Sequence, residues 1–455
     1  GAAVAAAVSV QPDGAVRVDA EGRITAARLA EVLRLPLEQW MVGETPWQGQ
    51  VVFPVPDSEG PLRMEIASGL EGMAVTLPQP FRKASAERRG LKVQAEFSDP
   101  DYFDTVLEWD DGLRAAARID RTGPDLRLGV VPGGVENAAP GVVLSGAVAE
   151  LDLGGWFGVE WPEQVGGEGL RQSLAGGRVL IGRLVTPWAV FPDLLLEATN
   201  EESQWRFAVD AERAAGRLDL PHTLYGDEPV AVNFDRLWLL QSDARDDASK
   251  ETPPEAGAAA DRIAPSLVPG IDLQVGDLRL GNIRFGSVSA LVLHEFDGFE
   301  LVGLEGMGDG FLFQARGRSR LSDTVDASSL VLELQSDDVA EALDFMQFRP
   351  SLDARSGRFE ANVEWQGGLR GDWLGAIEGT AKLDIRDGTL VGVEPGAGRV
   401  FGLLSIQALP RRLALDFKDV FGEGTAFDRI TGDFRIEGGD AYTENLVMRG
   451  PSADM

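Results

Sequence analysis

The sequence predicts a mainly β protein built around a long, curved antiparallel sheet with a few short helices. Apolar and polar side chains alternate with a period of two in many short segments, which places the two sets on opposite faces of a sheet. The 55 glycines and 25 prolines recur between these segments, where they suit turns. Because few segments suggest a strand–helix–strand unit, most neighbouring strands are expected to be antiparallel.

The clearest alternation lies in residues 381–450. Within this stretch it is strictest in three segments, 381–386, 412–418 and 430–437. Asp387-Gly388 and Gly438-Gly439-Asp440 supply residues that tolerate a positive φ, so we expect tight hairpins at both places. The interruption at Gly396–Leu409 has apolar residues at helical spacing after a proline, which predicts a short amphipathic helix.

Two further helices are expected elsewhere. Thr25–Trp40 has apolar residues at helical spacing and is broken by Pro36. A second helix follows Ser336, which we expect to be its N-cap, and its buried stripe is predicted to be Val339, Leu343 and Met346. Alternation predicts strands in the remaining segments, in chain order: 2–19, 45–55, 62–77, 91–97, 105–128, 142–153, 178–184, 194–199, 204–210, 216–220, 230–240, 269–334 and 359–365.

One segment differs in composition from the rest. Residues 241–262 are polar, charged and poor in apolar side chains, which is typical of a flexible loop. We therefore divide the chain into a first sheet segment at 1–240, a polar loop at 241–264 and a second sheet segment at 265–455. This loop is expected to be an insertion at the rim of one continuous sheet, and a domain boundary is the alternative.

Composition and charge exclude several classes of protein. The chain has 455 residues, 44% of them hydrophobic, which is enough for a folded core. It has no cysteine, so neither disulfides nor thiolate metal sites are available. A net charge of −31 opposes binding to nucleic acid and to anionic membrane surfaces. No apolar window reaches the ~18 residues that a membrane-spanning helix needs.

The sequence shows no constellation typical of an enzyme. Gly396-Ala397-Gly398 lacks the third glycine of a dinucleotide-binding turn and has no surrounding strand–helix–strand unit. The two histidines, His222 and His294, have no nucleophile or metal ligand at motif spacing. We therefore expect no catalytic residues, no metal and no cofactor. Trp156 and Trp161 suit sugar stacking or a membrane interface, although plugging the end of the β-core is the more common role.

The stretch EPGAGRVFGLLSIQALPRRLALDF, followed by FDRITGDFRIEGGDAYTENLVMRGPSA, resembles the C-terminal region of the large AsmA-like envelope proteins of the YhdP branch. Shorter phrases at Ser68–Lys83, Ala214–Pro221 and Leu278–Ala290 resemble recurring phrases of that family. The resemblance implies a U-shaped β-groove in the bacterial periplasm, an inner-membrane anchor, and phospholipid movement toward the outer membrane. Because the chain begins at Gly1 and ends in an expected strand, we interpret it as a segment whose membrane contacts lie outside it.

A sheet of this length must hide its apolar face. Roughly 25 strands spaced about 4.8 Å apart would extend on the order of 100 Å, which favours a trough over a compact sandwich. Phospholipid acyl chains are then the expected partner. A filled structural or assembly module of the envelope and a carbohydrate-binding β protein are the alternatives. The candidate lining residues are Leu273, Val275, Leu278, Leu280, Ile283, Phe285, Leu332, Leu383, Ile385, Leu413, Leu415, Phe417, Phe434 and Ile436.

Overall fold

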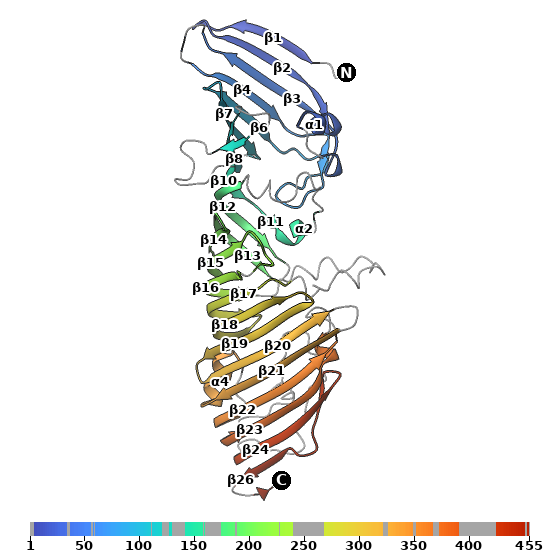
Figure 1. Ribbon diagram of the computed structural model, residues 1–455, viewed down its shortest axis with the longest axis vertical. Helices are drawn as coiled ribbons and strands as arrows, with labels where there is room; N and C mark the ends of the chain where they lie inside the picture. The colour runs from blue at the N-terminus through green and yellow to red at the C-terminus, as the bar shows by residue number, and fades with distance from the viewer. Residues whose placement is uncertain are drawn as a thin grey trace. The chain divides into compact units, whose positions relative to one another are not determined.

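The structure, a computed structural model, confirms a mainly β protein with short helices (Figure 1). The chain forms two compact units, Gly1–Glu212 and Arg213–Met455. The predicted loop at 241–264 lies outside the described residues, so the predicted division there stays a prediction. The structure describes residues 4–33, 37–55, 58, 60–110, 112–120, 127–129, 142–157, 159, 174–186, 189–226, 228–239, 268–321, 326–348, 352–366, 373–390, 425–450 and 453–454.

The first unit is a ladder of strands that pair almost in chain order. The ladder runs β1–β2–β3–β4–β6–β7–β8–β10–β12–β13–β14, and β5, β9 and β11 add short pairs to β3, β8 and β12. The strands are β1 (Ala5–Val10), β2 (Val16–Thr25), β3 (Met41–Phe53), β4 (Leu62–Ser68), β5 (Met73–Val75), β6 (Leu91–Phe97), β7 (Tyr102–Trp109), β8 (Leu113–Asp120), β9 (Arg127–Gly129), β10 (Val142–Val148), β11 (Leu151–Asp152), β12 (Leu174–Val185), β13 (Val190–Asn200) and β14 (Gln204–Asp210).

The second unit repeats this plan. Its ladder runs from β15 to β24 in chain order and continues through β26 to β27, while β25 pairs with the end of β24. Figure 1 shows β17 to β24 lying side by side in chain order. The strands are β15 (Ala214–Pro221), β16 (Val230–Leu239), β17 (Ile271–Leu280), β18 (Ile283–Glu295), β19 (Gly298–Gly308), β20 (Phe311–Leu321), β21 (Asp326–Ser336), β22 (Leu352–Trp365), β23 (Glu378–Leu390), β24 (Thr425–Glu437), β25 (Asp440–Tyr442), β26 (Val447–Gly450) and β27 (Ala453–Asp454).

The prediction of an antiparallel sheet is right for most strand pairs but not for all. Among the described pairs, β10–β12, β11–β12 and β16–β17 are parallel, so the sheet is mixed. Parallel neighbours need a connection of a dozen or more residues that returns to the starting edge. In the sequence, residues 149–173 separate β10 from β12, and residues 240–270 separate β16 from β17. Alternation within a strand carries no information about the direction of its neighbour, so the sequence pattern could not reveal these pairs.

The helices are short and lie near the strand ends. The predicted helix at Thr25–Trp40 is present as α1 (Ala26–Leu33) followed by the 3₁₀ turn η1 (Leu37–Gln39). The other helices described are α2 (Leu153–Phe157), α4 (Val339–Phe345) and the 3₁₀ turn η4 (Trp373–Ala376). The predicted helix at 396–409 lies outside the described residues.

Helix α4 confirms its predicted buried stripe but corrects its predicted cap. Leu343 and Met346 are buried, and Val339 packs beside them. The N-cap is Asp338 and not Ser336, because the Asp338 carboxylate accepts a 2.9 Å hydrogen bond from the backbone N–H of Glu341. A carboxylate at this position both satisfies an unpaired N–H and favours the positive end of the helix.

The predicted hairpin at Asp387-Gly388 is wrong, whereas the one at Gly438-Gly439 is confirmed. Gly438 and Gly439 have positive φ between β24 and β25. Asp387 also has a positive φ of 53°, but β23 continues through it to Leu390. A Cβ at Gly388 would lie 2.5 Å from the Phe427 ring, so this glycine serves a close approach between strands and not a turn.

Aromatic rings lie over glycines of the neighbouring strand on the apolar side of the second unit. A Cβ added at Gly306 would lie 2.1 Å from the ring of Phe313, and one added at Gly308 would lie 2.4 Å from the ring of Phe311. Both rings are buried, and Met346 of the α4 segment belongs to the same cluster. Large and small residues thus fill the space between strands at the density of a protein interior.

Replacing Gly306 by alanine tests this packing. Because the new methyl group overlaps the buried Phe313 ring, we expect the free energy of unfolding to fall by about 1–3 kcal/mol. Gly303→Ala on the same strand is the matched control, since its added Cβ would meet nothing within 4 Å. Urea unfolding measures both variants, and equal stability of the two would contradict this account of the packing.

Candidate functional site

A row of apolar residues crosses the whole first unit. Directly paired residues on neighbouring strands point to the same face of a sheet. Following the register from β1 to β14 gives one residue from each successive strand of the main ladder, and none has a polar side chain. The row is Ala6, Ala20, Gly49, Ile66, Val93, Leu107, Ala115, Leu144, Gly177, Ala198 and Phe207. We call the side of the sheet that carries this row the apolar face of the first unit.

This apolar face is open to solvent over its first strands. Val8 and Val10 of β1 are 71% and 73% exposed, and Phe53, Ile66 and Leu107 are 42%, 37% and 38% exposed. All five point to the apolar face, because each lies on the row or an even number of residues from a row member on its strand. A large exposed apolar surface of this kind marks an interaction site.

Part of the same face is covered by the protein itself. Trp109 lies two residues beyond Leu107 and is buried with Leu70 and Met73 of the segment between β4 and β6. Phe81 of this segment packs edge-on against Trp109, with ring centroids 5.3 Å apart. The segment is therefore a cap over part of this face, which is also buried further along the ladder, at Ile181 and Leu194.

A buried lysine holds this cap in place. Lys83 is only 3% exposed, and its ammonium donates hydrogen bonds to the backbone carbonyls of Leu70 (2.8 Å), Ala84 (2.9 Å) and Met73. Burial lowers the pKa of Lys83 below its ordinary value. Three carbonyl acceptors are what the three N–H donors of an ammonium require inside a protein.

The second unit has two such rows side by side on one face. The first consists of Leu218, Val232, Leu273, Ala290, Leu304, Ala315, Leu332, Ala361, Ala381 and Phe434. The second consists of Gly216, Phe234, Val275, Val288, Gly306, Phe313, Leu334, Phe359, Leu383 and Gly432.

The intervening residues of the same strands form a polar row on the opposite face. It consists of Arg217, Asn233, Gln274, Ser289, Glu305, Gln314, Glu333, Glu360, Lys382 and Asp433. The separation of apolar from polar side chains is complete along these three rows. A surface this uniform offers a ligand apolar contact along its whole length and no specific polar anchor.

The apolar face of the second unit is more enclosed than that of the first. Val275, Val288 and Phe313 are 3%, 4% and 8% exposed. Its side chains fall into three buried clusters, two of which include residues of α4. Partly buried side chains such as Leu278 and Phe285 pack against these clusters.

Most of the predicted lining residues lie on this face. Leu273, Leu332 and Phe434 belong to the first row, and Val275 and Leu383 belong to the second. Ile385 and Ile436 lie two residues further along β23 and β24, and Leu278, Ile283 and Phe285 join the cluster around Val288. Leu280 pairs with Ile283 at the end of the β17–β18 hairpin. Leu413, Leu415 and Phe417 lie outside the described residues. The exposed residues of the first unit were missed, although Val8 and Val10 alternate with small polar or apolar neighbours.

The sequence model of a family described as YhdP protein matches residues 1–455, which is the whole chain. This chain belongs to the YhdP family. The resemblance noted in the sequence is thereby confirmed.

A curated relative is the intermembrane phospholipid transporter YhdP of Escherichia coli (strain K12). It is 27% identical to this chain over 134 residues, which are 29% of this chain and 10% of the relative. The matched region therefore spans about a tenth of the transporter's length. No solved structure matches the chain.

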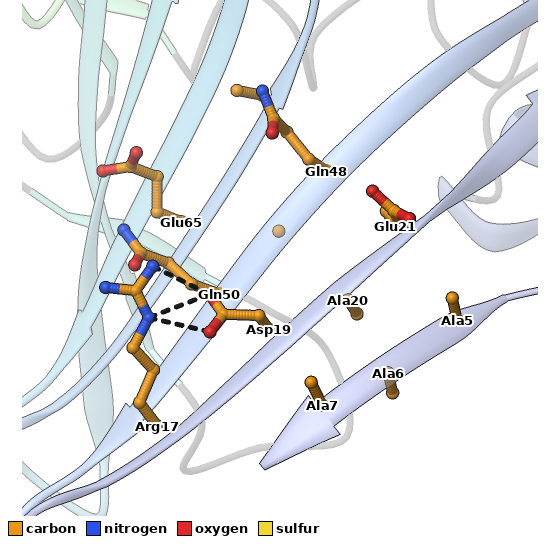
Figure 2. A pocket seen from close by; sticks show the side chains of 12 residues that line it. Ala5, Ala6, Ala7, Arg17, Asp19, Ala20, Glu21, Gln48, Gln50 and Glu65 are labelled. Atoms are coloured by element: carbon orange, nitrogen blue, oxygen red, sulfur yellow. Dashed lines mark hydrogen bonds and ion pairs between the residues drawn. The ribbon is translucent and has the colours of Figure 1, made fainter. Parts of the chain in front are cut away.

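Two hollows in this member of the YhdP family are lined by both polar and apolar residues. A hollow of about 510 Å³ in the first unit is lined by Asp19, Gln48, Gln50 and Glu65, whose side chains alternate with the apolar row. Figure 2 shows Arg17 paired with Asp19 there, with Gln50 and Glu65 close by. A hollow of about 710 Å³ in the second unit is lined by residues of both the polar row and the second apolar row, among them Gln274, Glu305, Val275 and Phe313.

The tryptophan and histidines singled out in the sequence are engaged in packing. The Trp156 indole N–H donates to the carbonyl of Gln79 at 2.9 Å, and its ring lies edge-on to Phe81. This is the plugging role and not an open sugar platform; Trp161 lies outside the described residues. The His294 Nδ1 lies 2.9 Å from the carbonyl of Val268, and its ring packs on Tyr225. His222 also has an interaction partner.

Neither a metal centre nor a membrane-crossing helix is found in the part of the chain that the structure describes. No group of three or more metal-ligating side chains occurs among these residues. None of the described helices combines the length and apolarity that crossing a membrane requires.

Arginines and carboxylates pair extensively, and two carboxylates each accept hydrogen bonds from two arginines. Asp277 accepts from Arg279 and Arg284. Asp384 accepts from Arg386 and Arg429, at distances between 2.7 and 3.2 Å. These hydrogen bonds hold the pKa of Asp384 well below its usual range.

The lowered pKa of Asp384 predicts an acid-dependent loss of stability. Because the folded pKa lies below the unfolded value of about 3.9, this carboxylate stabilises the fold above about pH 4 and loses that contribution as the pH falls further. Asp384→Asn should therefore be less stable at neutral pH and lose less stability on acidification. Urea unfolding of both proteins at neutral pH and below about pH 4 measures this difference.

Asp387→Asn is the control, since Asp387 has no arginine hydrogen bond among the described residues and asparagine tolerates its positive φ. An acid profile for Asp384→Asn that matched the unmodified chain would show that the two arginines do not lower the pKa of Asp384.

Proposed function

We propose that this chain carries phospholipid between the inner and outer membranes of the bacterial envelope, with acyl chains lying on the apolar faces of its sheet. The observation that carries the proposal is the open apolar face of the first unit, where Val8 and Val10 are more than two-thirds exposed. Membership of the YhdP family supports it, since one curated relative is named as an intermembrane phospholipid transporter.

The free energy available from such a surface suits a carrier. Transfer of one methylene from water to apolar surroundings is favourable by ~0.8 kcal/mol. An acyl chain of about 14 methylenes therefore gains roughly 11 kcal/mol of gross transfer free energy. This offsets the cost of holding a lipid in an aqueous compartment. Because successive strands present similar apolar residues, neighbouring positions bind the chain about equally, and the lipid can move from one strand to the next.

The curvature of the sheet into a U-shaped groove belongs to the same proposal. In this arrangement the predicted lining residues of the second unit and the exposed residues of the first unit face the interior. The polar rows face the aqueous periplasm, which the net charge of −31 favours. The membrane anchor and the membrane contacts would be supplied by segments outside this chain, and no enzyme activity is required.

A structural or assembly module of the envelope is the second candidate. The buried clusters of the second unit favour it, because a face filled by the protein's own side chains has no room for lipid. The two candidates differ in what the protein carries. Mass spectrometry of gently purified protein should find bound phospholipid for a carrier and none for a filled module.

Substitutions on the open face test the carrier directly. Ile66→Asp and Leu107→Asp place a carboxylate on the exposed apolar row, where a bound acyl chain would bury it. Because burying an unpaired charge costs several kcal/mol, we expect phospholipid photocrosslinking to fall by about tenfold or more. Both positions are solvent-exposed, so the sheet should still form.

Leu180→Asp is the matched control. Leu180 is 49% exposed and lies on β12, but it points to the face opposite the apolar row. This variant should crosslink phospholipid like the unmodified chain. Equal loss in all three variants, or no loss in any, would argue against acyl chains on the apolar face.

A further inference from the structure

We propose that Arg279 and Arg284 form a binding site for the phosphate of a lipid headgroup. The site lies in the second unit, beside the turn that joins β17 and β18. The inference rests on the proposed function and adds to it the part of the lipid that the apolar faces cannot recognise. Three features carry it: the geometry of the two arginines, an excess of positive charge, and the apolar cluster that adjoins them.

The two guanidinium groups are fixed in place by a shared carboxylate and by aromatic rings. Arg284 Nε donates to Asp277 Oδ1 at 2.8 Å, and Arg279 donates to Asp277 Oδ2 through Nε at 3.1 Å and Nη2 at 3.0 Å. The Trp238 indole N–H donates to the same Oδ2 at 2.9 Å. The Arg279 guanidinium stacks 4.0 Å above the Trp238 ring, and that of Arg284 stacks 4.4 Å above the Phe345 ring.

This network has one negative and two positive charges. Burial would raise the pKa of Asp277, but hydrogen bonds from Arg284, Trp238 and Arg279 lower it, so the carboxylate stays ionised. Both terminal nitrogens of Arg284 and Nη1 of Arg279 donate to no described residue. The side chains of Arg279 and Arg284 are 36% and 37% exposed, so both reach solvent. Unused N–H groups on fixed guanidinium planes match the oxygens of a phosphodiester.

The site lies where an apolar surface ends. Arg279 stands between Leu278 and Leu280, and Arg284 between Ile283 and Phe285, at the closed end of the β17–β18 hairpin. Leu278, Ile283 and Phe285 belong to the apolar cluster of the second unit, as does Phe345, on which Arg284 stacks. The two faces of a sheet meet at a strand end, so one lipid can place its acyl chains on the apolar face and its phosphate on the arginines.

The other two-arginine carboxylate differs in its setting. Arg386 and Arg429 share Asp384 in the same two-to-one ratio and are 56% and 47% exposed. The structure records no aromatic ring stacked on either guanidinium, among the residues it describes. Both arginines also adjoin an apolar cluster, through Ile385 and Ile430, so this pair separates the effect of two arginines on one carboxylate from that of guanidinium groups stacked on aromatic rings.

The two guanidinium groups would bind a phosphate group. Such a group occurs both in a lipid headgroup and in free inorganic phosphate. A headgroup is favoured because the unused N–H groups lie next to apolar side chains, which free phosphate avoids and acyl chains require. Competition with inorganic phosphate distinguishes the two sources.

The test compares two lipids with the same acyl chains, of which one carries a phosphoglycerol headgroup and the other only a hydroxyl. Vesicles of phosphatidylcholine would carry either radiolabelled phosphatidylglycerol or radiolabelled diacylglycerol with the same acyl chains, and label transferred to the chain would be counted after gel filtration. Arg279→Gln/Arg284→Gln should lower loading of phosphatidylglycerol by about tenfold and leave diacylglycerol unchanged, since charge-assisted hydrogen bonds are lost. Arg386→Gln/Arg429→Gln, the control, should load both lipids like the unmodified chain.

A second variant guards against a purely structural effect. Asp277→Asn frees both arginines from their carboxylate, so it should raise phosphatidylglycerol loading, whereas damage to a structural network would lower it. Equal loss of both lipids in the double arginine variant, or a loss in Asp277→Asn, would overturn the assignment. Displacement of phosphatidylglycerol by inorganic phosphate would also overturn it, in favour of a free phosphate site.

Failure of the headgroup site is distinguishable from failure of the carrier function. If the unmodified chain takes up neither lipid, the proposed function falls and the headgroup site falls with it. If it takes up both lipids equally and the arginine substitutions change nothing, the carrier stands and the headgroup site is rejected.

Discussion

The backbone hydrogen-bond register between strands is the constraint on which the rest of this structure depends. Side chains on paired strands share a face only while the register holds, and a slip by one residue would exchange the apolar and polar sides of a strand. In the second unit the register keeps two apolar rows and one polar row uninterrupted across ten strands, from Gly216, Arg217 and Leu218 to Gly432, Asp433 and Phe434. The proposed lipid path and the solvated outer side are two consequences of this one alignment.

The same alignment gives each unit an apolar face, but the two faces are covered by other side chains to different extents. In the first, Val8 and Val10 lie open, and a cap held by the buried Lys83 covers part of the face. In the second, aromatic rings fill the space above glycines and α4 adds its own apolar side chains. A carrier needs the first arrangement for contact with lipid, and a long sheet needs the second for stability, since an isolated exposed face contributes no burial.

Period-two alternation made the fold class and most strands predictable, because the pleat imposes that period on any half-buried strand. It could not identify the parallel pair β16–β17, whose direction is set by a long connection and not by side chains. Turn chemistry was less reliable: Asp387-Gly388 has the composition of a hairpin, but Gly388 makes room for Phe427. Most of the described candidates lie on the apolar face of the second unit, because a strand's apolar side is visible in its sequence; their role as a lining stays a prediction. The arginine pair at Asp277 was missed, because its three charges come together only when β17 and β18 fold back on each other.

The placement of Phe313 over Gly306 ties the two positions together during evolution. A larger residue at 306 fits only when the residue at 313 is smaller, so an enlargement at 306 needs a matching reduction at 313. Such reciprocal exchange would preserve the volume between β19 and β20 without preserving either amino acid.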